Sequence, residues 1–293
     1  MLTKLRMYIT SDDFEITRHI SSVLHGVIMS VIDTDYANIL HNSNLNPFST
    51  SLVKNGDEWC WTVATVGQEA YNKIFKVIAD KSFSSFVLTS KENAVVNIVK
   101  KETFEIPVEN LLKATFNDEP SSVLKISFDT PAAFKSKNDY VIVPDLHLVF
   151  QSLMKKATAA TSDDSFFDEE TLDALVQNSK IISYNLRTVK FSLEGRRITG
   201  FTGYISIYIK GPSLLKNFAK TLFRFGEYLG VGPRCRRFKS CHLDHRKSRI
   251  RKPFLSFLVR LFFVFYLLKY AKIQEKRLKM LGKCKAEKVV IFT

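Results

Sequence analysis

One histidine stands where the sequence changes from an amphipathic pattern to a polar, turn-rich segment. His41 follows the short amphipathic run 36–40 and precedes Asn-Ser-Asn-Leu-Asn-Pro at 42–47. An imidazole has an ordinary pKa that lets it accept and donate protons near neutral pH. His41 therefore offers general acid–base chemistry from the end of a helix. The ordinary alternative is a helix-end histidine that binds a backbone carbonyl, and His41 alone does not decide between the two.

Other clusters of reactive residue types have spacings that fit no known site. Cys235, Cys241, His242 and His245 do not match a closed zinc site. The acidic run 162–170 lacks the spacing of a calcium loop and is interpreted as a solvated surface turn. The sequence contains no phosphate-binding GxxxxGK motif, no nucleophile elbow and no HExxH motif. We therefore expect no metal and no cofactor.

The positive charge of the chain is concentrated at its C-terminal end. Residues 233–293 hold 18 Lys and Arg against 3 Asp and Glu, which leaves 25 against 26 in residues 1–232. A basic segment of this kind can bind nucleic acid or an anionic membrane surface. Four cysteines without regular spacing, and an N-terminus without an apolar signal core, predict a reduced cytoplasmic protein.

An apolar run within the basic segment falls short of a membrane span. Residues 254–268 are apolar except for Arg260 in the middle. A span needs about 20 residues, and a central charge costs roughly 2.5–3.5 kcal/mol on insertion. We do not expect a membrane helix, although a membrane-attached basic protein remains an alternative function.

The periodicity of apolar residues predicts the same order of elements twice. The chain of 293 residues is long enough for two domains, and its 24 Phe suit packed cores. In the first round we expect strands at 2–10, 49–54, 58–66, 85–88 and 94–106, with helices at 16–31 and 68–79. In the second round we expect strands at 123–129, 181–193 and 198–210, with helices at 144–155, 170–177 and 212–228.

This order is that of the ferredoxin-like fold, which alternates strand, helix, strand, strand, helix, strand. The predicted fold class is α+β, with two tandem ferredoxin-like (RRM-like) domains at 1–118 and 119–232 and an atypical basic tail at 233–293. The second domain needs one more strand, and segment 234–245 is a poor candidate for it. A missing last strand would leave one edge of the second sheet unpaired.

The strand 200–207, GFTGYISI, loosely resembles the strand on which RNA-binding domains carry stacking aromatic residues. Its basic and aromatic positions are only partly filled. We interpret it as an ordinary strand with Phe201 in the core.

Six segments in order carry a family resemblance. They are SVLHGVIM at 22–29, the His41 region at 35–48, FDTPAAF at 128–134, and the segments 139–154, 198–212 and 225–232. Together they make the chain similar to the CRISPR-associated endoribonucleases of the Cas-six family, in particular to members that accompany type III systems. The resemblance implies two ferredoxin-like domains and cleavage of CRISPR precursor RNA within its repeats. The products would be guide RNAs that pass to an effector complex.

The resemblance also implies a mechanism that uses no metal. The 2′-hydroxyl upstream of the scissile phosphate attacks it and leaves a 2′,3′-cyclic phosphate and a 5′-hydroxyl, a reaction that needs proton transfer and stabilisation of charge. His41 matches the catalytic histidine of the family.

The auxiliary catalytic groups of the family are absent from their usual positions. Met29 stands where some members have a tyrosine, and segment 42–48 contains no lysine. His25 lies four residues before Met29, on the same side of the predicted helix. We hypothesise that His25 and His41 act together as acid and base; the alternative is that His25 is a helix surface residue. Lys54 is the nearest cation in sequence that can steady the phosphate.

The glycine-rich loop that the family places before its last strand is only begun in this chain. Gly230 and Gly232 match it, but Pro233 and a basic sequence follow, with no further glycine until Gly282. We interpret this segment as the product of a frameshift or of gene decay, with a genuine basic extension as the alternative. Candidate RNA contacts are Lys135 and Lys137 beside the 128–134 match, Lys54, the two loop glycines, and Arg234; each cation can equally be a solvated surface residue.

The departures leave two rival functions. The fold can bind repeat RNA without cutting it, as a binding module or a degenerate copy, or the tail can attach a basic protein to a membrane. The first rival predicts binding with no cyclic-phosphate product. The second predicts that deletion of residues 233–293 abolishes membrane association.

Overall fold

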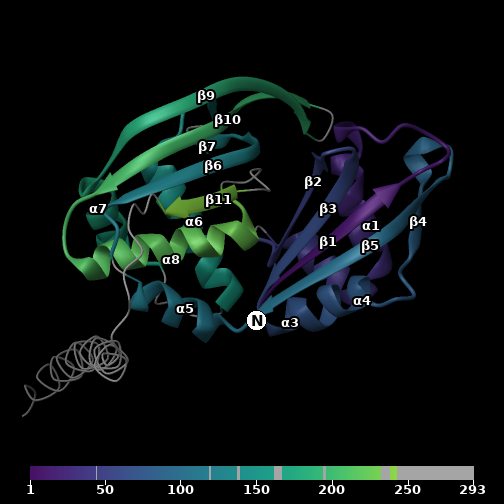
Figure 1. Cartoon of the computed structure of the whole chain (residues 1–293), viewed down its shortest axis with the longest axis horizontal. Helices are drawn as coiled ribbons and strands as arrows, with labels where there is room; N and C mark the ends of the chain where they lie inside the picture. Colours follow the sequence, from purple (N-terminus) through teal and green to yellow (C-terminus); the bar gives the residue numbers. More distant parts are fainter. Residues whose placement is uncertain are drawn as a thin grey trace, which may run out of the picture. The chain divides into compact units, whose positions relative to one another are not determined.

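The computed structural model describes residues 1–43, 45–118, 120–136, 139–161, 167–193, 196–231 and 238–242. Residues Met1–Asp244 form one compact unit, which holds one five-stranded sheet and one four-stranded sheet (Figure 1). Each sheet is antiparallel and has helices packed on one of its faces.

The first sheet has the strand order β2-β3-β1-β5-β4. Leu5, Met7 and Ile9 of β1 are buried in one core with Trp61 and Val63 of β3, because alternate residues of a strand face the same side. The strands are β1 (Leu2–Thr10), β2 (Phe48–Asn55), β3 (Glu58–Val66), β4 (Ser85–Leu88) and β5 (Ala94–Ile106). The helical segments are η1 (Arg18–Ser22), α1 (Val23–Val31), α2 (Thr34–Asn42), α3 (Gln68–Ala70), a π-type turn (Tyr71–Phe75), α4 (Lys76–Ala79) and the short turn η3 (Thr89–Lys91).

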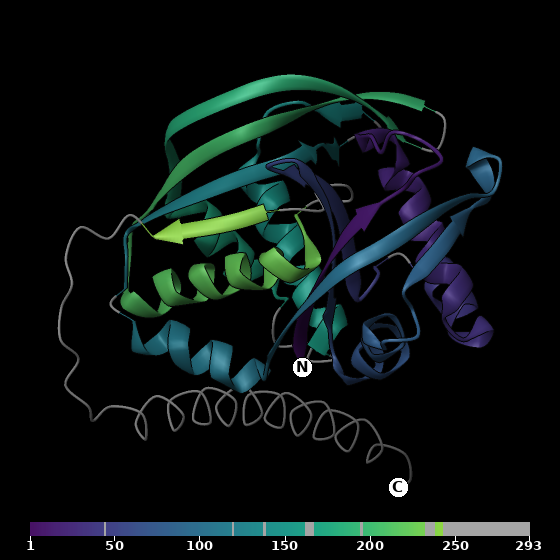
Figure 2. The same ribbon diagram turned by 45° about the vertical axis from the view of Figure 1, so that its right-hand side comes forward.

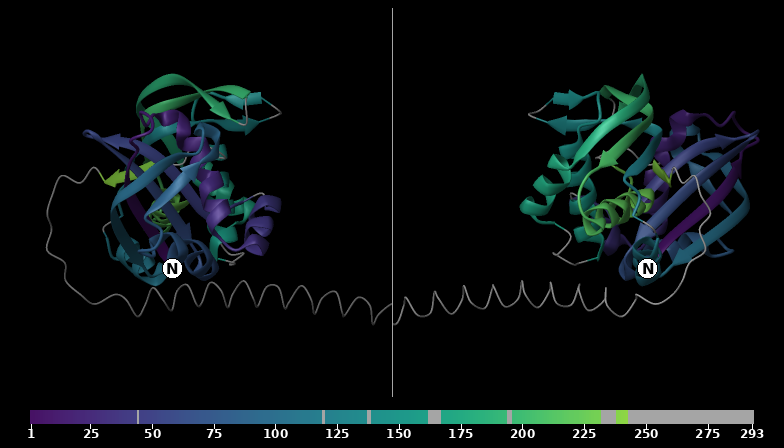
Figure 3. Two further views of the ribbon diagram at one scale, coloured as in Figure 1. Left: turned by 90° about the vertical axis from the view of Figure 1, so that its right-hand side faces the viewer. Right: turned by 60° about the vertical axis from the view of Figure 1, so that its left-hand side comes forward.

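The second sheet has the order β11-β6-β10-β9, and helices α6 and α8 lie beneath it (Figure 2). A short hairpin, β7–β8, lies beside β10 (Figure 3). The strands are β6 (Val123–Ala132), β7 (Phe134–Ser136), β8 (Asp139–Val141), β9 (Ser179–Leu193), β10 (Arg196–Ile209) and β11 (Phe238–His242). The helices are α6 (Leu146–Thr161), α7 (Glu169–Gln177) and α8 (Ser213–Leu229). Both sheets thus have the strand order of a ferredoxin-like fold, as predicted, with β4 as an addition to the first.

β11 lies within segment 234–245, which the sequence makes a poor strand candidate, and it completes the second sheet. β11 pairs antiparallel with β6, from Phe238 opposite Phe128 to His242 opposite Leu124. The ladder is made by backbone groups, and β11 is an edge strand, where basic residues are common in natural sheets. The basic sequence of this segment therefore does not prevent it from completing the sheet.

Strand β10 depends on one glycine. Gly203 has a φ of +119°, and a Cβ atom added there would lie 2.0 Å from the backbone oxygen of Asn185 in β9. The pairing of β10 with β6 shifts register between Phe201 and Gly203. Glycine is needed here because a side chain would have no space and would strain the backbone.

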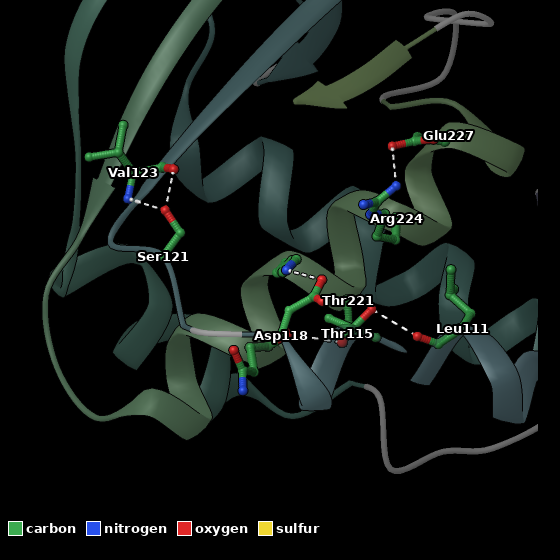
Figure 4. A network of polar contacts seen from close by, with 10 residues as sticks. Leu111, Thr115, Asp118, Ser121, Val123, Thr221, Arg224 and Glu227 are labelled. Atoms are coloured by element: carbon green, nitrogen blue, oxygen red, sulfur yellow. Dashed lines mark hydrogen bonds and ion pairs between the residues drawn. The ribbon is translucent and has the colours of Figure 1, made fainter. Parts of the chain in front are cut away.

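The helix that connects the two halves was not predicted from the sequence. α5 (Val108–Asn117) follows β5 and packs against α8. Lys220 of α8, whose side chain is only 4% exposed, lies 2.7 Å from the carboxylate of Asp118. Figure 4 shows Asp118 at the end of α5. The Thr115 hydroxyl donates to the Leu111 carbonyl within α5 (Figure 4). The connection is therefore fixed to the second half by a charged hydrogen bond.

Candidate functional site

His41 lies in the last turn of α2 and is exposed, so it occupies the expected position at a helix end. The helix begins at a cap, because the Tyr36 amide donates to the Asp33 carboxylate at 3.1 Å. Tyr36 itself is buried at 4% exposure. Burial, and to a smaller extent the charge of Glu69, raise the pKa of Tyr36 to about 12, so it is not a proton acceptor near neutral pH. His41 is thus the titratable side chain that α2 exposes near its C-terminal end.

Two hydrogen bonds connect Ser43 to Leu45 in the segment after His41. The Ser43 hydroxyl donates to the Leu45 carbonyl at 2.8 Å and accepts from the Leu45 amide at 3.3 Å. The Pro47 carbonyl accepts from the Val66 amide at 2.8 Å, which fixes the end of the turn to β3. This arrangement fixes the start of β2 relative to the helix that carries His41.

His25 packs against the first residue of β2. Its ring is stacked on Phe48, with the ring centres 5.3 Å apart and an angle of 7° between the planes. One face of the imidazole is therefore covered by an apolar ring. Met29, one helical turn later, packs against the first core.

The residue after Phe48 connects the first half to the second. The Ser49 hydroxyl donates to the backbone carbonyl of Tyr228, in the last turn of α8. The Lys4 ammonium lies 4.6 Å from the centre of the Tyr228 ring. The Lys156 ammonium, from α6, donates to the carbonyls of Leu229 at 2.9 Å and Gly230 at 3.3 Å.

We call Phe48, Ser49, Tyr228, Gly230 and Lys156 the helix-end junction. Gly230 ends α8 with a φ of 71°, a conformation that favours glycine. The junction places the beginning of the glycine-rich loop next to the strand that follows the His41 turn. The two segments that the sequence singled out are therefore connected by a hydrogen bond from the Ser49 side chain to the Tyr228 backbone.

The remaining candidate residues are not part of this junction. Lys54 is exposed six residues after Phe48 on β2, which corresponds to about 20 Å along the strand. That distance is too long for Lys54 to reach a phosphate held at the start of β2. Lys135 lies in β7, in register with Tyr140 of β8. Lys137, Gly232 and Arg234 lie outside the described residues.

The face of the second sheet opposite to its helices carries aromatic and basic residues that the sequence analysis missed. Phe201 is in the core as expected, at 1% exposure. Tyr204 and Tyr208, at alternate positions of the same strand, face the other side. The Lys125 ammonium lies 4.0 Å from the Tyr204 ring centre, and the Lys180 ammonium lies 5.6 Å from the Tyr208 ring centre. The sequence signal that could have identified this face is the alternation of apolar core residues with tyrosines in the strand 200–208.

Among the residues that the structure describes, no group of three or more His, Cys, Asp or Glu side chains is placed to hold a metal ion. Within the same residues, no helix has the length and apolar character needed to cross a membrane. The apolar run 254–268, Cys235 and His245 lie outside the described part of the chain.

Two ferredoxin-like halves, with tyrosines beside lysines on one sheet face, define a class of fold that includes RNA-binding domains. A family model described as CRISPR-associated endoribonuclease Cas6 matches residues 126–236, a range that includes Gly230, Gly232 and Arg234. A CRISPR-associated endoribonuclease Cas6 of Streptococcus thermophilus is 32% identical over 208 residues, which cover 71% of this chain and 84% of that protein. The corresponding protein of Mycobacterium tuberculosis is 29% identical over 210 residues, covering 71% of this chain and 66% of that protein. The chain belongs to the Cas6 family of CRISPR-associated endoribonucleases, the enzymes that process CRISPR repeat RNA.

Solved structures show the same fold at low sequence identity. A product complex of a Cas6 protein of Thermus thermophilus has a TM-score of 0.68 and 14% identity, and the match covers 82% of this chain and all of that one. A Cas6-related protein of Pyrococcus furiosus has a TM-score of 0.53 and 10% identity, with 83% of this chain and 99% of that one covered.

Proposed function

We propose that the protein cuts CRISPR precursor RNA within its repeats by attack of the 2′-hydroxyl on the adjacent phosphate. The attacking oxygen forms a bond to phosphorus while the bond to the 5′-oxygen breaks, and the products are a 2′,3′-cyclic phosphate and a 5′-hydroxyl. One proton leaves the 2′-hydroxyl and one is delivered to the 5′-oxygen. The RNA supplies the nucleophile, so the reaction requires no metal.

His41 is the group that we propose for proton transfer. The observation that carries the proposal is its exposed position at the end of α2, directly before the turn that leads to the helix-end junction. A positioned acid or base contributes typically 10²–10⁴-fold to such a rate. We propose His25 as its partner, with its ring plane fixed by Phe48.

RNA contacts are proposed at two places. The first is the helix-end junction, where Gly230, with Gly232 and Arg234 after it, lets an RNA phosphate approach backbone amides. The second is the open face of the second sheet, where Tyr204 and Tyr208 offer rings for base stacking, with lysines for the phosphates. Lys54, Lys135 and Lys137 remain proposed contacts away from the cut. Product complexes of Thermus thermophilus Cas6 support RNA as the ligand, and we expect the guide RNA to pass to effector-complex proteins.

The test is cleavage of the host's own repeat RNA in EDTA by the full chain and by His41→Ala and His25→Ala. We expect the unaltered protein to produce 2′,3′-cyclic ends and His41→Ala to lose at least about 10²-fold in rate while it still binds RNA. Cleavage by His41→Ala at the unaltered rate would remove His41 from the mechanism. An unaltered rate for His25→Ala would leave His25 as a packing residue for Phe48.

A second candidate function is repeat binding without cleavage. It is favoured by the stacking of Phe48 on His25 and by the absence of a lysine from the His41 turn. This candidate predicts that the unaltered protein and His41→Ala bind the repeat equally well and that neither forms a cyclic phosphate. The same cleavage assay therefore decides between the two functions.

A further inference from the structure

The C-terminal end of α8 is an unfavourable place for an RNA backbone unless its charge is changed. The last carbonyls of a helix have no partner within it and carry a partial negative charge, equivalent to about half an elementary charge. No basic residue occurs in the last turn of α8. Glu227 lies in that turn, but its carboxylate is 3.7 Å from the Arg224 guanidinium, so the free carbonyls are the main negative charge at the helix end. Each phosphate of RNA is also negative. Gly230, where we place an RNA phosphate, follows directly after these carbonyls.

We propose that Lys156 is a positioning residue that makes the end of α8 compatible with the RNA backbone. This inference rests on the proposed function. The Lys156 ammonium comes from α6 and contacts the carbonyls of Leu229 and Gly230. It is the cation that directly contacts these two carbonyls, and it fixes the backbone at Leu229 and Gly230. Lys156 acts through Gly230, and its charge offsets the repulsion between the helix end and a phosphate.

In the first half of the protein, another lysine contacts the carbonyls at the end of a helix, but we propose no RNA contact there. The Lys101 ammonium donates to the carbonyls of Ile78 at 2.8 Å and Asp80 at 2.6 Å, at the end of α4. The segment after α4 is closed on itself, because the Asp80 carboxylate accepts from the Ser82 amide and hydroxyl. Lys101 is therefore a matched control: its removal has the structural consequence of losing a helix-end lysine, without a proposed RNA contact nearby.

A second control lies next to Lys156 in sequence. Lys155 is exposed, and its ammonium lies 5.4 Å from the Phe167 ring centre. Lys155→Met changes the net charge by the same amount as Lys156→Met. It separates the local effect of Lys156 from a general loss of positive charge.

The experiment compares Lys156→Met, Lys156→Gln and Lys156→Arg with Lys101→Met and Lys155→Met in the full chain. The probe for binding is the host repeat RNA with a 2′-deoxy nucleotide at the cut position. Binding is measured at about 0.05 M and about 0.5 M salt, since charge effects weaken as the screening length falls. The single-turnover cleavage rate at saturating RNA and the Tm are measured on the same preparations.

We expect Lys156→Met to raise the Kd about fivefold to tenfold at low salt and less at high salt. We expect Lys156→Gln, which keeps a hydrogen-bond donor, to retain the Tm but still bind weakly, and Lys156→Arg to restore binding. The cleavage rate at saturating RNA should remain within about threefold in all three, because Lys156 does not transfer a proton. Lys101→Met should lower the Tm without changing the Kd, and Lys155→Met should change neither by much.

Three results would overturn the inference. The first is an unchanged Kd for Lys156→Gln, and the second is an equal rise in Kd for Lys101→Met and Lys156→Met. The third is an equal rise for Lys155→Met, which would indicate bulk charge. Failure of the proposed function is distinguishable, because in that case the unaltered chain does not cut the repeat, whereas failure of this inference leaves cleavage intact and dependent on His41.

Discussion

The two halves of the protein share a strand order, but they differ in the connection from the first helices to the second strand, which is α2 to β2 in the first half and α7 to β9 in the second. In the first half, α2 ends with His41 and Asn42, and a turn at 43–47 precedes β2. In the second half, Asn178 alone joins α7 to β9. Its amide and side chain both donate to the Ala174 carbonyl, and its own carbonyl accepts from the Lys210 amide. The first connection leaves the side chain of His41 exposed, whereas in the second connection Asn178 makes hydrogen bonds that fix the backbone.

The halves also differ in the connection that follows their last helix, which is α4 in the first half and α8 in the second. In the first half, the segment after α4 is closed by hydrogen bonds between Asp80 and Ser82. In the second half, α8 ends in Gly230, and segment 230–237 leads to β11. The Ser49 hydroxyl, near the start of β2, donates to the Tyr228 carbonyl in the last turn of α8 and so joins the two halves. The comparison indicates that the site is shared between two similar halves, each of which supplies a different part.

The largest expected effect concerns the connections α2–β2 and α7–β9, in each of which one side chain is replaced by alanine. His41→Ala should lower the single-turnover cleavage rate by about 10²–10⁴-fold, with an unchanged Tm, since proton transfer is lost and no packing is. Asn178→Ala, at the equivalent position of the second half, should cost about 1 kcal/mol of stability and leave the cleavage rate unchanged. A large loss of cleavage in both variants would show that the two connections do not differ in function.

The second prediction concerns one ion pair in each half. Lys220 and Asp118 are 2.7 Å apart with side-chain exposures of 4% and 49%, whereas Lys73 and Asp33 are 3.7 Å apart and both about half exposed. Asp118→Ala should cost about 3 kcal/mol in a urea unfolding experiment, because it leaves the Lys220 charge buried and unpaired. Lys73→Met should change the free energy of unfolding by less than about 1 kcal/mol. Equal costs would contradict the stronger attachment of α8.

The third prediction compares Tyr204 of the second sheet with Tyr8 of the first sheet, a residue that is only 8% exposed. Lys100 lies over Tyr8 in the first sheet, but Glu102 is 2.7 Å from that lysine and opposes RNA. Loss of a stacked base costs about 1–3 kcal/mol, so Tyr204→Leu should weaken repeat binding at least about fivefold in a filter-binding assay. Tyr8→Leu should leave it nearly unchanged. A larger effect at Tyr8 would move the proposed contact to the first sheet.

The smallest expected effect is at the hydrogen bond between the halves. Ser49→Ala should cost about 1 kcal/mol of stability, since the Tyr228 carbonyl loses a donor. The matched control is Ser30→Ala, because the Ser30 hydroxyl donates to the Val27 carbonyl within one helix at 2.9 Å. Only Ser49→Ala should also change cleavage, by a factor of a few, measured at saturating RNA. Equal behaviour of the two variants would leave the hydrogen bond without a role in the site.

Periodicity was sufficient to predict most of the fold. The predicted bounds of the strands at 58–66, 85–88 and 94–106 agree with the structure, because alternation of buried residues is a local property. α5 was not predicted, because the sequence between residue 106 and the expected domain boundary near 118 was assigned no element. β11 was underestimated, because its place in the sheet is set by the open edge of β6 rather than by its own side chains.

The site could be predicted only in part, and for a different reason. The helix-end position of His41 follows from the local pattern, and so does the beginning of the glycine-rich loop at Gly230. The hydrogen bond from Ser49 to Tyr228 joins residues 179 positions apart, and that from Lys156 to Leu229 joins residues 73 apart. Such contacts depend on how finished elements pack, which periodicity does not describe.

The core of the second half also includes residues of the first half, and this has a consequence for synthesis on the ribosome. Leu2, Ala64 and Val66 belong to the first half of the chain but are buried in the core that contains Leu222 and Phe223 of α8. At roughly 5–20 residues per second, these apolar side chains emerge about 8–45 s before α8 is available to cover them. During that interval the nascent first half exposes an apolar surface at one end of its sheet. The protein therefore needs either slow aggregation or chaperone protection until almost all of its second half has been made.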